Sequence, residues 1–356
     1  MRALVIHEAK DLRLEQREIP APAVGQIKVK VATGGICGSD LHYYNHGGFG
    51  AIRMKQPMIP GHEFSGYVDK LGAGVEGFAL GELVAISPSR PCGQCEYCHL
   101  ALHNHCLNMQ FYGSAMPFPH IQGGFQEELI VNAAQCIKAE GLTAGEAAMA
   151  EPFAVGLHAV QRAGNIFGKR VLITGCGPIG ALAAVAARRA GAAEVVITDL
   201  VSNALKFAEF AHVDHALNMH DNPDALASYT QGKGTFDVLF ECTGSAQALG
   251  GAIAAMRPRG IIVQLGLGGD MPVPMMQITA KELEIRGAFR FHDEFNLAIK
   301  LMQSGLVNLK PFISHTFELD RAHEAFEVAS DRSQAMKTQI TFSVSAQHRP
   351  IKPQPI

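Results

Sequence analysis

Tryptophan is absent from this chain of 356 residues, and aromatic side chains make up only 7 % of it. Charged side chains are also few, at 18 %, and they nearly cancel, to a net charge of −3 with histidine neutral. Proteins that bind nucleic acid carry clustered basic side chains, and those that bind single strands add aromatic platforms for the bases. The composition therefore predicts a protein without a nucleic-acid partner.

Long apolar runs are missing as well. The N-terminal stretch MRALVIHEAK has only four consecutive apolar residues, too few for the apolar core of a signal peptide. No later run approaches the roughly 18 to 20 apolar residues that a membrane-spanning helix needs. We therefore expect a cytoplasmic protein without a membrane partner. In that compartment clustered cysteines are metal ligands more often than disulfides.

Apolar material in total is abundant, because 47 % of the residues are hydrophobic, and the length suits two domains. Up to about residue 150, short stretches such as MRALVIH, QIKVKVATG and ELVAIS are separated by Gly or Pro, which indicates a mostly β region. The stretch from 34 to 50 is rich in glycine and reads as loops.

After Glu151 apolar strands alternate with helices. VLITG, EVVITD, FDVLFECTG and IIVQLGLG read as buried strands, and GPIGALAAVAARRAGA reads as a helix that ends at Gly191. EIRGAF (284–289) is a further strand candidate, NLAIKLMQSG has helical spacing, and MKTQITFSV reads as a last strand before the tail QHRPIKPQPI. This order predicts an α/β chain with a doubly wound parallel sheet.

A glycine-rich turn follows the first of these strands. Residues 175–180 read GCGPIG, which is GxGxxG between a strand and a helix, the context in which this pattern indicates a dinucleotide site. The three glycines allow a tight turn, a close approach of the backbone to a pyrophosphate, and close packing of the helix on the strand. The expected cofactor contacts are Gly175, Gly177, Pro178, Ile179 and Gly180. The alternative is a glycine-rich turn without a ligand.

Asp199 strengthens the prediction of a dinucleotide site. It ends EVVITD, 24 positions after Gly175, near the offset of about 20 expected for the acid that binds the adenosine ribose hydroxyls. A carboxylate there repels a 2′-phosphate, so the sequence favours NAD over NADP. The alternative role for Asp199 is that of a helix N-cap or turn residue.

Four of the eight cysteines are clustered. Cys92, Cys95, Cys98 and Cys106 have the spacing C-x2-C-x2-C-x7-C, which can bring four thiolates onto one tetrahedral ion at about 2.3 Å. Four thiolates complete the shell and leave no position for water or substrate, so the pattern predicts a structural zinc. An iron–sulfur cluster, a metal-free thiol cluster and a zinc ribbon for nucleic acid are the alternatives. The slightly negative net charge argues against the last of these.

A second group of residues could form an open metal site. Cys37 and His62 lie in glycine-rich stretches, Glu63 follows His62, and Glu151 lies at the junction of the two halves. One Cys, one His and one carboxylate leave a fourth position open, which is typical of catalytic zinc. Asp40 could accept a hydrogen bond from the other ring nitrogen of His62. From residue types alone, ordinary core or surface roles explain the Cys and the His equally well.

The stretches GGICGSDLHYY, PGHEFSG, CGQCEYC, EPFAVGLHA and VLITGCGPIG occur in the order of the zinc-containing medium-chain dehydrogenase/reductase family. The chain resembles this family from about residue 1 to 343, and within it the polyol branch that includes sorbitol dehydrogenase. The resemblance implies a GroES-like, mostly β catalytic domain over 1–154 and 290–356. It implies an NAD-binding Rossmann domain over 155–289.

The resemblance also implies roles for the residues of the open metal site. Cys37 and His62 are expected to bind catalytic zinc. Family members differ in the third ligand, so Glu63 and Glu151 both stay candidates. Ser39 matches the hydroxyl that begins the proton relay in this family.

Substrate and cofactor contacts follow from the same resemblance. Tyr43 and Phe111 match substrate-pocket positions, and Arg290 matches an arginine that reaches both cofactor and substrate. Phe291 stands where the sorbitol enzyme has a tyrosine, which removes a hydroxyl. Ala204 stands where that enzyme has an arginine, so NAD is expected without exclusion of NADP. The further expected cofactor contacts are Thr243, Leu265 and Gly266.

The implied activity is oxidation of a secondary alcohol of a polyol or sugar acid, with zinc as Lewis acid and hydride transfer to NAD. The stretches FYGSAMPFPHIQGGF and GAFRFHDEFN favour L-idonate or a similar aldonate, oxidised at C5 to 5-keto-D-gluconate. Sorbitol, xylitol, another polyol or threonine are alternative substrates. A structural or binding protein and a zinc-free quinone reductase are alternative classes. The resemblance also predicts a homo-oligomer, either a tetramer or a dimer.

Overall fold

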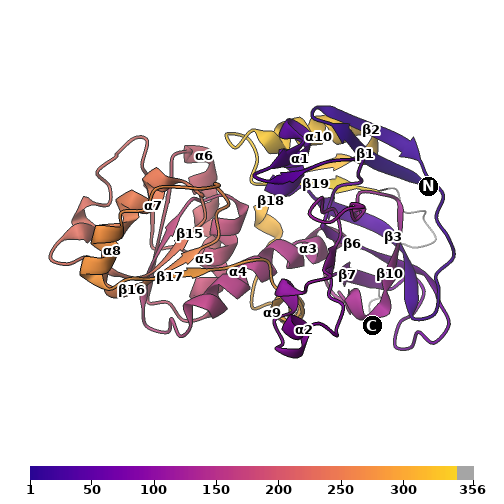
Figure 1. The fold of residues 1–356 in the computed structure, drawn as a ribbon, viewed down its shortest axis with the longest axis horizontal. Coiled ribbons are helices and arrows are strands. Elements are labelled where there is room, and N and C mark those ends of the chain that lie inside the picture. Colours follow the sequence, from indigo (N-terminus) through magenta and orange to yellow (C-terminus); the bar gives the residue numbers. More distant parts are fainter. Residues whose placement is uncertain (343–356) are drawn as a thin grey trace, which may run out of the picture. The chain divides into compact units, whose positions relative to one another are not determined.

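The computed structural model describes residues 1–342, which fall into two compact units (Figure 1). Of the described residues, the first unit comprises Met1–Glu151, Phe295–Ser330 and 337–342, and the second comprises Pro152–Glu294 and Asp331–Met336. The short segment Asp331–Met336 therefore groups with the second unit, whereas the sequence placed it in the catalytic domain. The tail QHRPIKPQPI lies outside the described residues.

The strands of both units vary in length, and the longest, β3, belongs to the first unit. In chain order they are β1 (Arg2–Glu8), β2 (Asp11–Gln16), β3 (Gln26–Gly35), β4 (Gly48–Phe49), β5 (Ile52–Arg53), β6 (Glu63–Leu71), β7 (Leu83–Ile86), β8 (Ser89–Arg90), β9 (Gln110–Phe111), β10 (Glu128–Asn132), β11 (Cys136–Lys138), β12 (Arg170–Thr174), β13 (Glu194–Asp199), β14 (His215–Asn218), β15 (Phe236–Glu241), β16 (Met256–Gln264), β17 (Glu284–Gly287), β18 (Ile313–Glu318) and β19 (Lys337–Thr341).

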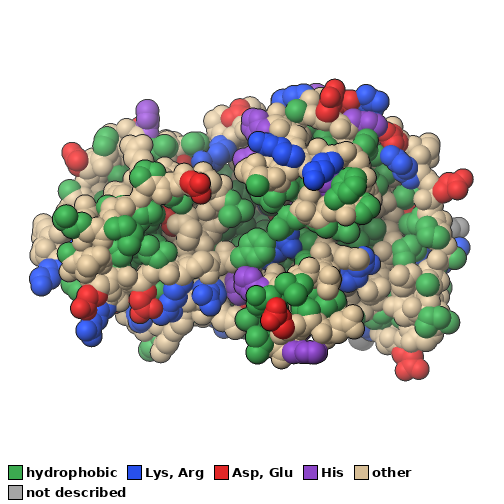
Figure 2. Space-filling view, viewed as in Figure 1, with side chains coloured by type: hydrophobic (Ala, Val, Ile, Leu, Met, Phe, Trp, Pro, Cys, Tyr) green, Lys and Arg blue, Asp and Glu red, His purple; other side chains and the backbone are tan. Residues whose placement is uncertain are grey.

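The helices over the same described range are α1 (Gly38–His46), α2 (Glu96–His99), α3 (Ala144–Ala148), α4 (Ala150–Ala163), α5 (Pro178–Arg189), α6 (Ser202–Leu205), α7 (Ala246–Ile253), α8 (Met275–Lys281), α9 (Glu294–Gln303) and α10 (Ala322–Ser330), with short 3-10 turns between them. None of those lying within residues 1–342 is long and apolar enough to cross a membrane. On the face drawn in Figure 2, basic and acidic side chains are interspersed.

The first unit is built on a mostly antiparallel sheet in the order β11-β7-β6-β3-β19-β18, with β10 also paired to β3. Strand β3 shows why the sequence folds this way. Its residues Ile27, Val29 and Val31 alternate with less buried neighbours, the two-residue period of a strand with one face on a core. The expected β-rich first half is therefore confirmed.

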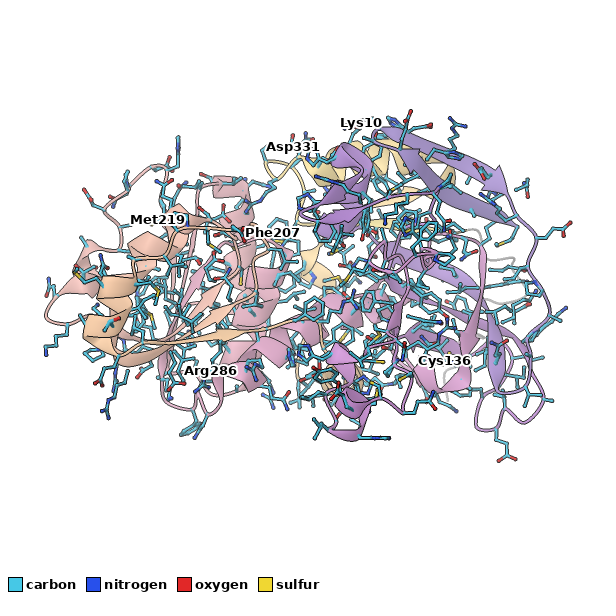
Figure 3. All side chains as sticks on the ribbon, in the orientation of Figure 1. Lys10, Cys136, Phe207, Met219, Arg286 and Asp331 are labelled. Atoms are coloured by element: carbon cyan, nitrogen blue, oxygen red, sulfur yellow. The ribbon has the colours of Figure 1, made fainter. Side chains whose placement is uncertain are left out.

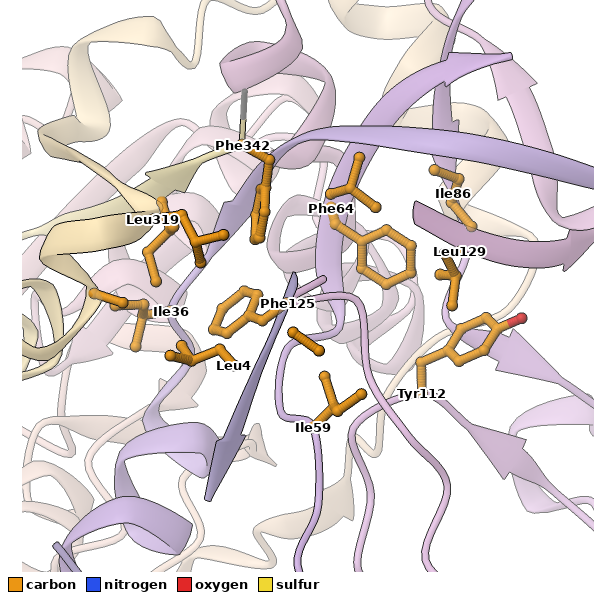
Figure 4. Close-up of a cluster of buried hydrophobic side chains, with 14 of the residues drawn as sticks. Leu4, Ile36, Ile59, Phe64, Ile86, Tyr112, Phe125, Leu129, Leu319 and Phe342 are labelled. Carbon is orange, nitrogen blue, oxygen red and sulfur yellow. The ribbon is translucent and has the colours of Figure 1, made fainter. Parts of the chain in front are cut away.

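The core of this unit surrounds the Phe125 ring (Figure 4). A Cβ added at Gly34, in β3, would lie 2.7 Å from that ring, and one added at Gly61 would lie 2.3 Å from it. Real Cβ atoms do not come so close to carbon atoms, so both glycines are required where the two segments pack on one ring. Gly61 immediately precedes His62, and the hydrophobic core therefore fixes the backbone of a predicted metal ligand.

The second unit contains a six-stranded parallel sheet in the order β14-β13-β12-β15-β16-β17. The first strand in the chain is central, and the sheet grows outward first on one side and then on the other, which is the doubly wound Rossmann order. Leu172, Val196 and Leu239 from three neighbouring strands pack with Leu249 and Ile253 of α7 in one buried cluster. The predicted fold class is confirmed.

The glycine-rich stretch from 34 to 50 is not all loop, because residues 38–46 form α1. Asp40, the third residue of this helix, accepts a hydrogen bond from the backbone N–H of Cys37, the N-cap residue, at 3.0 Å. Gly47 ends the helix in the left-handed conformation, with φ 65°. Glycine density predicted a loop, but a helix with a good cap at each end formed between the glycines.

Candidate metal and cofactor sites

Three side chains in the first unit come together as the open-site hypothesis requires. Their ligand atoms, from Cys37, His62 and Glu63, all lie within 4.8 Å of one another. The pairing of β3 with β6 explains this, because Gly35 is opposite Glu63 in the antiparallel register. Cys37, just after the end of β3, therefore lies beside the start of β6, where His62 and Glu63 are found.

Asp40 ties these two segments together. Its side chain is fully buried, and its Oδ1 accepts the Gly61 N–H at 2.9 Å while Oδ2 accepts the Cys37 N–H at 3.0 Å. Burial raises the pKa of this carboxyl, and the two N–H donors oppose that shift. The expected hydrogen bond to His62 does not form, since Nδ1 lies 3.8 Å from Oδ1. Asp40 therefore positions the ligand backbones rather than the imidazole.

The site fits a divalent cation. The Nδ1 atom of His62 is buried and has no hydrogen-bond partner within residues 1–342. Desolvation, and next the charge of Glu63, raises the pKa of the Cys37 thiol to about 12. A bound cation would offset the cost of burying the unpaired imidazole nitrogen and the cost of ionising the buried thiol. It favours the thiolate and gives the imidazole a fixed environment. A thiolate, an imidazole and a carboxylate are the donors that zinc takes in open, catalytic sites.

Glu63 forms a buried ion pair with a lysine that no sequence motif indicated. Lys337, the first residue of β19, donates from Nζ to both carboxylate oxygens at 2.7 Å and to the Ile36 carbonyl at 3.2 Å. Both side chains are at most 2 % exposed. Burial alone would lower the pKa of Lys337, but Glu63 and Cys37 outweigh it and the pKa is raised. The lysine thus stays charged and compensates the buried carboxylate.

Glu151, the other candidate ligand, is buried in the first turn of α4. It stands outside the group whose ligand atoms lie within 4.8 Å of one another. Burial raises its pKa to about 8, with further raising from Glu63 and Cys37 and lowering from His62 and Lys337. Of the two carboxylates, Glu63 is the one placed to complete the set.

The other predicted residues of the first unit lie around this group. Ser39, two residues after Cys37, lies in the first turn of α1, and its backbone N–H donates a hydrogen bond to the cysteine sulfur. The Phe111 ring centroid lies 5.6 Å from that of His62. Tyr43 is buried, and its hydroxyl accepts the Ala115 N–H at 3.1 Å.

Arg290 belongs to the second unit and has an unusual backbone. Its φ is +57°, a conformation that residues other than glycine rarely adopt, and its guanidinium lies 5.0 Å from the Phe289 ring centroid. Strained backbone of this kind is concentrated at functional sites. Phe291, which follows it, is fully buried.

The four clustered thiols form a compact group of their own. Their sulfur atoms all lie within 4.8 Å of one another, with separations of 3.5 Å for Cys95–Cys98, 3.9 Å for Cys95–Cys106 and 4.0 Å for Cys92–Cys98. Four sulfurs at 2.3 Å from a tetrahedral zinc would be about 3.8 Å apart. Backbone hydrogen bonds, with that from Gln94 the strongest, lower the pKa of Cys92 to about 6, whereas desolvation raises the pKa of Cys98 to about 12, a cost that a bound cation would offset. The group is therefore shaped for a four-thiolate ion.

Replacing Cys98 with alanine is expected to remove one zinc per chain and to lower the unfolding midpoint. We expect a fall of at least about 6 °C, which corresponds to a loss of roughly 3 kcal/mol in a unit of this size. Zinc content and differential scanning calorimetry measure the two effects. Cys136→Ala, at a buried cysteine outside both groups, is the matched control. Unchanged zinc content in the Cys98 variant would contradict the assignment.

The glycine-rich turn of the second unit has the geometry that the pattern predicts. Gly175 follows β12 with φ 89°, a conformation that favours glycine. A Cβ at Gly180 would lie 1.8 Å from the Gly175 carbonyl oxygen, so only glycine lets the helix close on the turn. Gly177 is the N-cap of α5, and Pro178 and Ile179 form its first turn. The turn presents a helix N-terminus suited to phosphates.

The neighbouring strand ends converge on one buried acid. Glu241, at the end of β15, accepts the Thr243 N–H through Oε1 at 2.8 Å, and its carbonyl accepts the N–H groups of Leu265 and Gly266 at 2.9 Å. A Cβ at Gly266 would lie 2.0 Å from the Gly244 nitrogen, so the two turns touch. The three predicted cofactor residues here are thus held beside the point where the strand order reverses, between β12 and β15.

Asp199 ends β13, and its carboxylate is engaged on both oxygens. Oδ2 accepts the Cys176 N–H at 2.7 Å and Oδ1 accepts the Leu200 and Val201 N–H groups at 2.7 and 2.9 Å. Oδ2 also accepts a hydrogen bond from Arg332 at 2.7 Å. No pattern in the sequence indicated this arginine, because it is 133 residues from Asp199 in the chain and belongs to no motif.

Comparison with known proteins defines the class. The alcohol dehydrogenase GroES-like domain matches residues 23–141, and the zinc-binding dehydrogenase matches residues 178–304. The chain belongs to the zinc-containing medium-chain dehydrogenase/reductase family, and it is a zinc-dependent, NAD(P)-linked alcohol dehydrogenase. The predictions of family, enzyme class and cofactors are confirmed.

Individual relatives define the branch. L-idonate 5-dehydrogenase (NAD(P)(+)) of Escherichia coli (strain K12) is 40% identical over 316 residues, 88% of this chain and 91% of that protein. Sorbitol dehydrogenase of Gallus gallus is 38% identical over 330 residues, 91% and 92% of the two chains. The crystal structure of L-idonate 5-dehydrogenase from Escherichia coli str. K-12 substr. MG1655 matches with a TM-score of 0.92 at 38% identity, covering 96% and 98%. The chain is thus a dehydrogenase of the polyol and sugar-acid branch.

Proposed function

We propose that this protein oxidises L-idonate at C5 to 5-keto-D-gluconate, with Cys37, His62 and Glu63 as the protein ligands of the catalytic zinc. The single observation that supports this best is the incomplete ligand set of the first unit, which leaves a position open for a substrate oxygen. Similarity to L-idonate 5-dehydrogenase over nearly the whole chain supports the choice of substrate. Cys92, Cys95, Cys98 and Cys106 are the ligands of a structural zinc in this proposal.

When bound, the zinc supplies a Lewis acid that lowers the pKa of the substrate hydroxyl. The protein's own residues complete the reaction. Ser39 takes the hydroxyl proton and passes it toward solvent. The glycine-rich turn and Asp199 would hold the dinucleotide, which would supply the acceptor for the hydride from C5. One proton and one hydride leave the alcohol, which gives the ketone and the reduced cofactor.

Recognition of a sugar acid requires a partner for its carboxylate. Arg290 has the right charge and a constrained backbone, and its planar fork suits a carboxylate. Tyr43 and Phe111 complete the substrate contacts in this proposal. Phe291 lacks the hydroxyl that the resemblance to the sorbitol enzyme implies at this position, so this residue offers no hydrogen bond to a polyol. Homo-oligomeric assembly, as a dimer or tetramer, and a cytoplasmic location stay predictions.

A substrate panel tests the proposal. L-idonate, sorbitol, xylitol and L-threonine are offered separately with NAD and with NADP, and formation of the reduced cofactor is followed by absorbance. We expect kcat/KM for L-idonate to exceed that for sorbitol by at least about tenfold, a difference of about 1.4 kcal/mol in transition-state binding. Turnover of sorbitol or threonine without turnover of L-idonate would overturn the substrate assignment and leave the enzyme class intact.

A further inference from the structure

The carboxylate that should bind the adenosine ribose has no acceptor position left. A carboxylate offers about four lone-pair directions. Three on Asp199 are taken by backbone N–H groups of the adjacent turns, and the fourth is taken by the Arg332 guanidinium at 2.7 Å. A ribose hydroxyl can therefore reach this carboxylate only by displacing a donor. Of these four donors, three belong to the backbone and Arg332 is the side chain.

Arg332 is held in this position by its own segment. Asp331, labelled in Figure 3, accepts hydrogen bonds from the Ser333 N–H and hydroxyl at 2.9 and 2.6 Å and from the Gln334 side chain at 2.5 Å. The Gln334 carbonyl in turn accepts the Asn203 side-chain amide at 3.3 Å, which ties the segment to α6. The segment Asp331–Met336 thus forms a tight turn beside the adenosine end of the site.

The guanidinium of Arg332 is also close to the glycine-rich turn and open to solvent. A Cβ placed on Gly177 would lie 3.9 Å from its Nη2 atom. Its side chain is 56 % exposed, whereas that of Asp199 is 3 % exposed. Arginine has five N–H donors, so the contact with the carboxylate leaves others available for a second anion.

A further donor lies nearby. Ser202, three residues after Asp199, is exposed, and its hydroxyl oxygen accepts the Asn218 side-chain amide at 2.7 Å. Its own O–H can therefore be directed to a ligand. In a Rossmann site, the residues just after the acid of the second strand face the 2′ position of the adenosine ribose.

We propose that Arg332 is the residue that lets this enzyme accept NADP as well as NAD. It neutralises Asp199 and binds the 2′-phosphate of NADP. The arginine keeps its contact with the carboxylate when NADP binds and turns other N–H groups to the phosphate. When NAD binds, the arginine withdraws and the ribose hydroxyls take its place on the carboxylate. The inference rests on the proposed dinucleotide site but is independent of the sugar substrate.

The test compares two adenosine fragments that differ only in the 2′-phosphate. AMP and adenosine 2′,5′-bisphosphate are titrated into the full-length protein by calorimetry, without sugar substrate, so failure of the L-idonate assignment cannot affect the result. The wild-type protein is expected to bind the bisphosphate at least as tightly as AMP. Arg332→Ala is expected to weaken bisphosphate binding by roughly tenfold to a hundredfold, the loss typical of a charged hydrogen-bond pair, and to leave AMP within about threefold.

Arg257→Ala is the matched control, because Arg257 is 57 % exposed and pairs with Asp237 at 2.7 Å, at the opposite ends of the strands from the glycine-rich turn. This control should bind both fragments as the wild type does. Weaker binding of the bisphosphate than of AMP by the wild-type protein would overturn the proposal. An equal loss of both fragments in Arg332→Ala would also overturn it, since the arginine would then only hold the segment in place.

Discussion

Replacing Cys37 with alanine is expected to lower dehydrogenase turnover by about a thousandfold or more while the protein keeps one zinc per chain. The cysteine supplies the thiolate of the open set, and its loss leaves only the imidazole and a carboxylate that already pairs with Lys337. Stabilisation of the negative oxygen by a positioned charge is usually the largest contribution to catalysis of this kind. The four-thiolate site shares no ligand with the open set and should stay filled.

Zinc content by mass spectrometry and initial rates of cofactor reduction measure these effects together. Cys136→Ala, a change of the same kind at a buried cysteine of the same unit, should keep both zinc ions and nearly full activity. A Cys37→Ala variant that turned over at the wild-type rate would show that the chemistry lies elsewhere.

Replacing Lys337 with methionine is expected to destabilise the metal-free first unit by about 3–5 kcal/mol. The change leaves the Glu63 carboxylate, which is 1 % exposed, without its cationic partner, and removing one member of a buried ion pair has costs of this size. Zinc would bring its own positive charge to the same carboxylate. The loss should therefore be smaller in the zinc-loaded protein.

Denaturant unfolding of the apo and zinc-loaded forms, followed by a signal from the first unit, measures both quantities. The double variant Glu63→Gln, Lys337→Met removes both charges and should recover much of the stability of the apo protein. An equal loss in the apo and zinc-loaded forms of Lys337→Met would argue against Glu63 as a zinc ligand and in favour of Glu151.

The second unit could be read from the sequence almost strand by strand. EVVITD coincides with β13, because a parallel strand buried on both faces appears as a continuous apolar run with clear ends. The first unit contains several strands of only two to four residues, which are too short to show a pattern, and α1 was missed because the glycines on both sides of it concealed its caps. Local patterns therefore predicted the fold best where burial was complete.

The sites were likewise predicted best where their residues are close together in the sequence. GxGxxG and the clustered cysteines are local, so their spacing alone indicated the geometry that the structure has. Cys37 and His62 are brought together by the pairing of β3 with β6; residue types left their role open, and the family resemblance favoured a shared metal site. Lys337 and Arg332 come from positions 274 and 133 residues away from the acids that they bind, and no motif marks them. Long-range ion pairs of this kind cannot be read from spacing.

The central claim is that the open three-ligand set, and not the four-thiolate group, binds the substrate. The most direct test of this claim uses cobalt in place of zinc. Cobalt reports its ligands through its visible absorption, and the two sites differ in their number of sulfur ligands. We predict that L-idonate, added with the oxidised cofactor, changes only the absorption bands that are missing in Cys37→Ala and preserved in Cys98→Ala. A response of the bands that Cys98→Ala removes, with none from the others, would contradict the account.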